Sequence, residues 1–307
     1  MKTKRALIVL FALCILLSGC GGEPEKTEAD AIERLTVCCS FTPIYALAKP
    51  VFEGVPDVTF KCLIQPQDGC LRNYALSEWD LSVLTLADAV ILGGRGLESF
   101  ASDISSMQDA PATVSLMNNM TLYGQDEKLV SGDEEISHLR GANPHYYLSV
   151  QGAIEMTNAI AFAMQQMDAR YAPLYEKNRA AQEKALSALQ DEMEEILLNA
   201  NAAPVALWHE GLIYIAEEFG LDAAVRIDRE SASGLDGGDY ENAVSEMRRA
   251  GCRVVLIENQ APDPLIRALV RDGFSVAKID VLSSNDEYIP AMLQNAHAIF
   301  DALNKIT

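Results

Sequence analysis

The run from Ala172 to Asn199 reads APLYEKNRAAQEKALSALQDEMEEILLN, and it decides how the rest of the chain is divided. It is rich in Ala, Leu, Glu, Lys and Gln, and after Pro173 it contains neither glycine nor proline, which favours one continuous helix. At 1.5 Å per residue such a helix would be about 40 Å long. We therefore predict a rigid connecting helix over residues 173–200, with one lobe on each side of it.

Strand-like and helix-like runs alternate on the N-terminal side of this helix, in residues 35–172. Such alternation is typical of a parallel sheet flanked by helices. The Leu76–Leu86 run has apolar residues at helical spacing, namely Leu76, Trp79, Val83 and Leu86. A polar loop is expected over about 123–143. The expected strands are Leu35–Ser40, Val58–Ile64, Ala89–Leu92 and Thr113–Leu116.

The same alternation returns on the C-terminal side, in residues 201–307. The fold class that follows is α/β, with two lobes that each hold a parallel-type sheet flanked by helices, joined by one long connecting helix. The sequence has no GxGxxG fingerprint after a strand and no Walker loop, which argues against a nucleotide site. The expected strands are Pro204–Trp208, Ala223–Ile227, Val254–Glu258 and Val276–Ile279.

Two short segments place a histidine where a strand-like run gives way to a helix-like run. They are Asn143–Leu148 (NPHYYL) and Leu207–Tyr214 (LWHEGLIY), and they hold two of the four histidines of the chain. Such junctions are where an α/β protein builds a small-ligand site. Because one segment belongs to each half, a site made from both would lie in the cleft between the lobes.

The N-terminus predicts an exported, membrane-anchored protein. Residues 1–19 combine a positive start with the apolar stretch Ala6–Leu17, which is too short to span a bilayer and is typical of an export signal. The sequence Leu17-Ser-Gly-Cys20 resembles a bacterial lipobox, which implies cleavage before Cys20 and lipidation of that residue. Residues 20–34 then form the lipidated cysteine and a flexible tether, so we expect an extracytoplasmic protein held at the cell membrane by its lipid.

Charge and cysteine content narrow the function further. A formal net charge of −20 argues against nucleic acid as a partner. Seven cysteines without any CxxC pair exclude a zinc finger. Cys62 and Cys70 flank a predicted loop, and both a disulfide between them and a pair of thiols are compatible with the sequence.

Several short motifs, in their order along nearly the whole mature chain, resemble the metal-binding solute-binding proteins of bacterial ABC transporters, the ZnuA/TroA-like family. The motifs are Ser40-Phe-Thr-Pro43, Leu71-Arg-Asn-Tyr74, Ala87-Asp88 with Gly94-Arg-Gly-Leu-Glu98, Asn143-Pro-His-Tyr-Tyr147, His209 to Tyr214 with Phe219-Gly-Leu221, and Lys278-Ile-Asp280.

The resemblance implies a binding function and its partners. Members of the family hold a divalent metal, usually Zn²⁺ or Mn²⁺, between the lobes through three histidines and one carboxylate, and they deliver it to a membrane permease driven by an ATPase. Two histidines carry over as His145 and His209 and the carboxylate as Asp280, with Glu258 as a supporting residue. Imidazole and carboxylate suit both metals. We expect a monomer.

The position of the first family histidine is occupied by Arg72. A guanidinium stays protonated and has no lone pair to offer, so Arg72 cannot be a ligand. One reading keeps the metal on His145, His209 and Asp280, with water or Cys70 completing the shell. In a second, Arg72 pairs with Asp280 and the protein is an accessory lipoprotein without a ligand. In a third, Arg72 recognises an anionic group, such as a carboxylate of a chelator that carries the metal.

An enzyme is the remaining alternative, because two histidines and a carboxylate also resemble a catalytic zinc shell. Glu210 or Glu258 would then be the general base. The lipobox, the long helix and the two similar halves favour a receptor, so we expect no catalysis.

Overall fold

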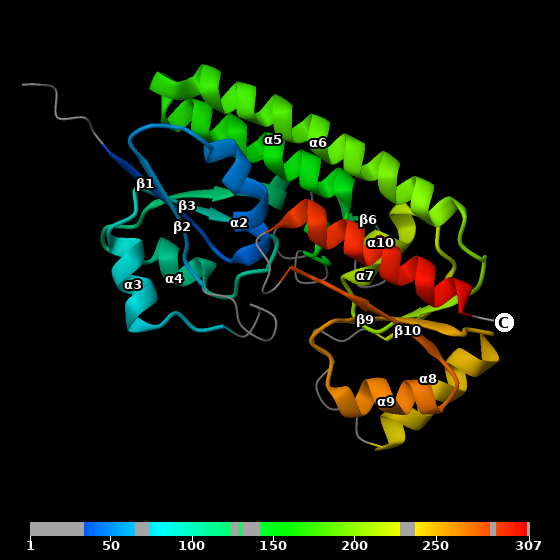
Figure 1. Ribbon diagram of the computed structural model, residues 1–307. Coiled ribbons are helices and arrows are strands. Elements are labelled where there is room, and N and C mark those ends of the chain that lie inside the picture. Colours follow the sequence, from blue (N-terminus) through cyan, green and yellow to red (C-terminus); the bar gives the residue numbers. More distant parts are fainter. Residues whose placement is uncertain are drawn as a thin grey trace, which may run out of the picture. The chain divides into compact units, whose positions relative to one another are not determined.

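The computed structural model describes residues 34–64, 74–123, 129–130, 142–227, 237–282 and 287–305 (Figure 1). The first half builds a four-stranded parallel sheet with the order β2-β1-β3-β4. Its helices are α2 (Thr42–Ala48), α3 (Glu78–Thr85) and α4 (Ala101–Ser105). Its strands are β1 (Leu35–Cys39), β2 (Val58–Cys62), β3 (Ala89–Leu92) and β4 (Ala112–Ser115).

The second half builds another four-stranded parallel sheet, with the order β10-β9-β7-β8. Its strands are β7 (Val205–Leu207), β8 (Ala223–Arg226), β9 (Val254–Glu258) and β10 (Ser275–Ile279). Its helices are α7 (Leu212–Glu218), α8 (Gly237–Arg249), α9 (Asp263–Arg271) and α10 (Tyr288–Asn304). In both sheets the first strand lies inside, between the second and the third, and the fourth lies at an edge. The α/β prediction is confirmed.

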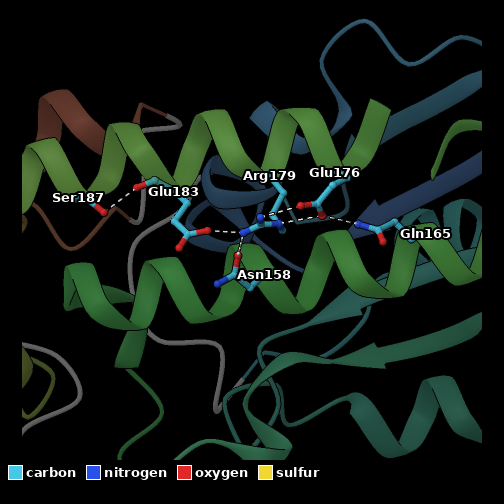
Figure 2. Close-up of polar contacts among 6 residues, drawn as sticks. All are labelled: Asn158, Gln165, Glu176, Arg179, Glu183 and Ser187. Carbon is cyan, nitrogen blue, oxygen red and sulfur yellow. Dashed lines mark hydrogen bonds and ion pairs between the residues drawn. The ribbon is translucent and has the colours of Figure 1, made fainter. Parts of the chain in front are cut away.

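The long helix is α6, which spans Ala172–Leu198 and packs along α5 (Val150–Met167), as Figure 1 shows. The polar residues between the two helices form one network around Arg179 (Figure 2). The guanidinium donates to Asn158 of α5 at 2.9 Å and pairs with Glu176 and Glu183 of α6, and Gln165 of α5 donates to Glu176 at 3.1 Å. These side chains are partly exposed, so each pair adds only a little stability.

One hydrophobic core is shared by both halves. It contains residues of both sheets together with α5, α6 and α10, for example Val37 and Ile91 from the first sheet and Leu256 and Ile279 from the second. Two smaller clusters cover the other faces of the sheets, around Phe100 in the first half and around Trp208, Met247 and Leu269 in the second. Each sheet is therefore buried on both faces, which explains the continuous apolar strands.

Two expectations from the sequence do not match the structure. The expected loop from 123 to 143 contains β6 (Leu129–Val130), which pairs antiparallel with β5 (Leu122–Tyr123), and two-residue strands are too short for a periodic pattern to reveal. Only half of the apolar stripe in and beside α3 faces inward: Leu76 and Val83 pack against the cluster around Phe100, whereas Trp79 is 57% and Leu86 77% exposed. Asp80 and Leu84 also point inward.

A hydrogen-bond network fixes that orientation of α3. Ser77 and Asp80 form a capping box, and the Tyr74 hydroxyl donates to Asp80 at 2.8 Å. Within the residues that the structure describes, no helix has the length and apolar character needed to cross a membrane. The signal, Cys20 and the tether up to residue 33 lie outside those residues.

Candidate metal centre

His145 is held by the residue two positions before it. It precedes the short 3-10 helix Tyr146–Leu148, just before α5 begins. Asn143 accepts from the His145 backbone N–H at 3.2 Å and lies 2.9 Å from the ring Nδ1, and both contacts use the amide oxygen Oδ1. The Asn143 side chain thus contacts both the backbone and the ring of His145, and the Glu210 carboxylate lies 3.5 Å from the same ring nitrogen.

His209 follows β7 by two residues and lies just before α7. The Gly211 backbone N–H donates to His209 Nδ1 at 3.0 Å, so the turn between strand and helix orients the ring. The carboxyl ends of β7, β9 and β10 share one edge of the parallel sheet, and His209 stands at that edge.

The structure brings the two histidines together. Their ring centroids are 4.8 Å apart with planes at 79°, and each residue is only 3% exposed. The segments that carry them are bonded to each other, because Asn143 Nδ2 donates to the Glu210 carbonyl at 2.8 Å and the Tyr214 hydroxyl donates to the Asn143 carbonyl at 2.6 Å. Residues far apart in the sequence thus form one buried histidine pair.

Gly211 permits this approach. A Cβ added at that position would lie 2.7 Å from the Cβ of His145 and 3.0 Å from a methyl group of Leu148. No side chain other than hydrogen fits there without displacing the segment that carries His145. The glycine is thus part of the site, although the sequence motif indicated only a helix start.

The two rings are in different protonation arrangements. Asn143 offers its oxygen to His145 because its nitrogen donates to the Glu210 carbonyl, so His145 Nδ1 carries the proton and the lone pair lies on Nε2. His209 Nδ1 accepts from Gly211, so the neutral ring carries its proton on Nε2. The neutral His145 ring therefore has its free lone pair on Nε2, whereas the lone pair of His209, on Nδ1, already accepts from the Gly211 N–H.

The carboxylates predicted for the site stand at neighbouring strand ends. Glu258 is the last residue of β9 and is buried, and it is in register with Ile279, the residue before Asp280. Asp280 is held at its backbone by Asn295 of α10, which accepts from its N–H at 2.7 Å and donates to its carbonyl at 2.9 Å. Its carboxylate accepts from the Leu282 N–H at 2.8 Å. Asp280 does not cap the helix that follows, because α10 begins at Tyr288.

The described part of the chain does not contain a complete metal shell. Among those residues no group of three or more His, Cys, Asp and Glu side chains is gathered so that it could hold an ion. Arg72 and Cys70 lie outside them, and so does the predicted pairing of Cys62 with Cys70. The Cys62 thiol donates to the Ile64 carbonyl at 3.1 Å.

The corresponding strand ends of the first sheet are tied together by Glu98. This buried carboxylate accepts from the hydroxyl of Ser40, which follows β1, at 2.7 Å, and from the N–H groups of Gly93 and Gly94, which follow β3, at 2.8 and 2.9 Å. Burial raises the pKa of Glu98, and the three donors oppose that rise. Gly94 has a φ of +85°, and a Cβ there would lie 2.1 Å from Ser115 Oγ, so the Gly-x-Gly-x-Glu pattern forms a turn closed by its own glutamate.

A second contact between the halves has no signal in the sequence. Glu218 of α7 accepts from the backbone N–H groups of Val150 and Gln151, in the first turn of α5, at 2.7 and 3.0 Å. A carboxylate at a helix N-terminus satisfies donors that the helix itself leaves unpaired. Burial raises the pKa of Glu218.

Comparison with known proteins identifies relatives over the whole folded part. The family model described as "Zinc-uptake complex component A periplasmic" (ZnuA) matches residues 37–302. The metal ABC transporter substrate-binding lipoprotein ScbA of Streptococcus cristatus is 22% identical, over 99% of this chain and 100% of its own. The zinc-binding lipoprotein AdcA of Streptococcus pneumoniae is 24% identical over 96% of this chain, which spans only 60% of AdcA.

Solved structures share the fold. The substrate-binding protein FpvC of Pseudomonas aeruginosa, crystallised with Ni²⁺, superposes with a TM-score of 0.76 at 20% identity, covering 89% of this chain and 98% of FpvC. A crystal structure of ZnuA superposes with a TM-score of 0.73 at 19% identity, covering 88% of this chain and 99% of that one.

Proposed function

Because the chain belongs to the ZnuA family of zinc-uptake proteins, we propose that it captures Zn²⁺ or Mn²⁺ outside the cytoplasm and delivers the ion to the permease of an ABC transporter. The family consists of substrate-binding transport components rather than enzymes. Relatives are named as metal-binding lipoproteins of such transporters, which supports the assignment of this substrate class.

The single observation that carries the proposal is the buried pair of His145 and His209, contributed by the two halves and 4.8 Å apart between ring centroids. His145 presents a lone pair on Nε2, and the lone pair of His209 on Nδ1 would become available once its bond from the Gly211 N–H is broken. Asp280, at the end of β10, is proposed as the carboxylate ligand, with Glu258 as a supporting acid. Charge neutralisation by one carboxylate suits capture of a dication.

Metal titration tests this function. The soluble form starting at Gly21 is stripped with chelator and titrated with Zn²⁺ and with Mn²⁺ by calorimetry, beside the double variant His145→Ala, His209→Ala. The matched control is His297→Ala, which removes an exposed histidine of α10. We expect one tight site in the parent and in the control and none in the double variant. Equal binding by all three proteins would contradict the assigned ligands.

A second candidate function is favoured by the ring arrangement of His209 and by the absence of a three-residue shell in the described part of the chain. In that case Arg72 would bind an anionic group of a chelated metal. Titration with zinc citrate separates the two functions. If the protein binds the free ion, Arg72→His should increase its affinity for Zn²⁺. If it binds the chelated ion through Arg72, the same substitution should abolish zinc citrate binding. An accessory lipoprotein without a ligand would bind neither.

Anchoring and partners are the remaining parts of the proposal. Cys20 is the proposed lipid attachment site, and the lipid would keep the protein beside its permease and ATPase as a monomer. Replacement of Cys20 by Ser should release the protein from the membrane fraction and prevent incorporation of labelled palmitate. Membrane association that survives this substitution would rule out Cys20 as the anchor.

A further inference from the structure

A cavity in the C-terminal half lies beside β10 and α9, and neither histidine of the pair lines it. It has a volume of about 610 Å³, within the range of small-ligand sites. Its wall includes Arg253, just before β9, Gly273–Ser275 at the start of β10, and Lys305, which follows α10. The strands are parallel, so their amino ends lie at the edge opposite the one where His209 and Asp280 stand.

Three cations surround this cavity. Arg253, Lys278 and Lys305 are all exposed, and each comes from a different element. No acidic side chain lines the cavity, and within the described residues no ion pair joins any of these three to a carboxylate. In a chain with a net charge of −20, a set of three cations without acids is a local attraction for an anion.

The floor of the cavity is apolar. It is formed by Ile266 and Val270 of α9 together with Phe274 and Val276. Val270 is 56% exposed although its neighbour Leu269 is fully buried, so the helix presents an apolar side chain to the cavity in addition to its core face. An occupant that satisfies both parts of the wall has an apolar body and a negatively charged head.

The position of β10 offers a simpler explanation for only one of the cations. β10 is an edge strand, and lysines on edge strands prevent pairing with other chains. That explains Lys278. It does not explain Arg253, which precedes the neighbouring strand, or Lys305, which comes from the end of a helix, and it predicts no cavity between them.

We propose that this edge cavity is a binding site for a dissolved amphipathic anion, with its carboxylate or sulfonate between Arg253, Lys278 and Lys305 and its apolar body against Val270 and Phe274. The site is separate from the histidine pair, so this inference does not depend on the proposed function. A ligand here would contact Arg253 just before β9, the start of β10, and Lys278, which lies two residues before Asp280.

The test uses 8-anilinonaphthalene-1-sulfonate, whose fluorescence rises in apolar sites, with the soluble form that starts at Gly21. This form retains the whole compact unit that begins at Leu35. We expect a single class of sites from which octanoate, but not the uncharged octanamide, displaces the probe. The triple variant Arg253→Gln, Lys278→Gln, Lys305→Gln removes all three charges and should weaken probe binding about tenfold. Each exposed charge is expected to contribute only part of this loss of binding free energy.

Two further variants keep the proposal falsifiable. The control Lys177→Gln, Lys184→Gln, Arg249→Gln changes the net charge equally at exposed positions away from the cavity and should bind the probe like the parent. Val270→Asp changes an exposed floor residue and should abolish binding without loss of the thermal transition. If both triple variants bound the probe more weakly to the same extent, the loss would be due to the change in net charge alone, and this result would overturn the proposal. So would binding to phosphatidylglycerol vesicles without any displacement by octanoate, which would assign the cations to a membrane surface.

Discussion

The two sheets have the same strand order, β2-β1-β3-β4 in the first half and β8-β7-β9-β10 in the second, but their carboxyl ends differ in chemistry. In the first sheet the residues after β1 and β3 are joined by Glu98, whose carboxylate accepts from Ser40 and two glycine N–H groups. In the second sheet the carboxyl ends of β7, β9 and β10 carry His209, Glu258 and Asp280, which are metal-ligand types. One topology thus serves as a closed scaffold in one half and as a candidate binding edge in the other.

The largest effect is expected on stability, from a substitution at Glu98 in the first sheet. Glu98→Ala would leave the Ser40 hydroxyl and two buried N–H groups without an acceptor, and we expect a loss of about 3 kcal/mol in the free energy of unfolding. Urea denaturation measures this. Metal affinity should stay within about twofold of the parent, and a loss of metal binding in a folded Glu98→Ala protein would erase the distinction between the two sheets.

In the second sheet, a substitution at a candidate ligand should lower metal affinity and leave stability nearly unchanged. His209→Ala is expected to weaken Zn²⁺ binding by at least about 100-fold, because a ligand is removed, and to change stability of the metal-free protein little. Ser40→Ala, at the residue that directly follows β1 in the first sheet, is the control and should bind Zn²⁺ like the parent. Calorimetry on both variants decides whether only the second sheet supplies a strand-end ligand.

Gly211→Ala tests whether the second sheet depends on its approach to His145. The added methyl would lie 2.7 Å from the His145 Cβ, and we expect a loss of about 2 kcal/mol in unfolding free energy together with weaker Zn²⁺ binding. Gly220→Ala is a stability control at a position where φ is +62° but no atom lies within 4 Å of the added carbon. We expect Gly220→Ala to lower the unfolding free energy through backbone strain and to leave Zn²⁺ affinity unchanged.

A pH series sharpens the comparison at the contact between halves. Burial raises the pKa of Glu218, so the folded state holds its proton more tightly than the unfolded state, and this residue's contribution to stability falls as pH rises above the unfolded pKa of about 4.5. The unfolding free energy of the parent minus that of Glu218→Gln should therefore be larger at pH 4.5 than at pH 7. A difference that grows with pH would contradict the burial of this carboxylate.

The smallest effect is expected far from either strand end, in the network between α5 and α6. Arg179→Met removes the contacts to Asn158, Glu176 and Glu183 but keeps an unbranched apolar stem, and partial exposure limits the loss to about 0.5 kcal/mol. Thermal melts at low and high salt measure it. The difference from the parent should shrink in high salt.

The hydrophobic pattern of the sequence was sufficient to predict the fold class and most of the strands. The predicted strands Ala89–Leu92 and Val254–Glu258 match β3 and β9 residue for residue, because a short continuous apolar run leaves little choice. The pattern was only partly right for α3, where Val83 packs inward but Trp79 is exposed, because the hydrogen bonds of the buried Asp80 help to set the orientation of the helix. Local spacing carries no information on which of two faces a tertiary contact will select.

The candidate site also has features that the sequence predicted and features that only the structure shows. The motifs indicated that His145 and His209 matter, and the structure places them in contact. The closeness of Gly211 to His145 and the bonds from Glu218 to α5 could not be inferred, since each joins residues about 66 or more positions apart whose partners no motif names. The assignment of the metal ligands remains a prediction.

The core shared by both sheets has a consequence for how ligand capture is sensed. Because Val37, Ile91, Leu256 and Ile279 belong to one cluster, the halves should melt in a single cooperative transition. An ion bound between the histidines then adds its binding free energy to the whole chain at once, by RT ln(1 + [L]/Kd). Resistance to heat or to a protease, measured anywhere in the folded unit, would thus report occupancy of the site.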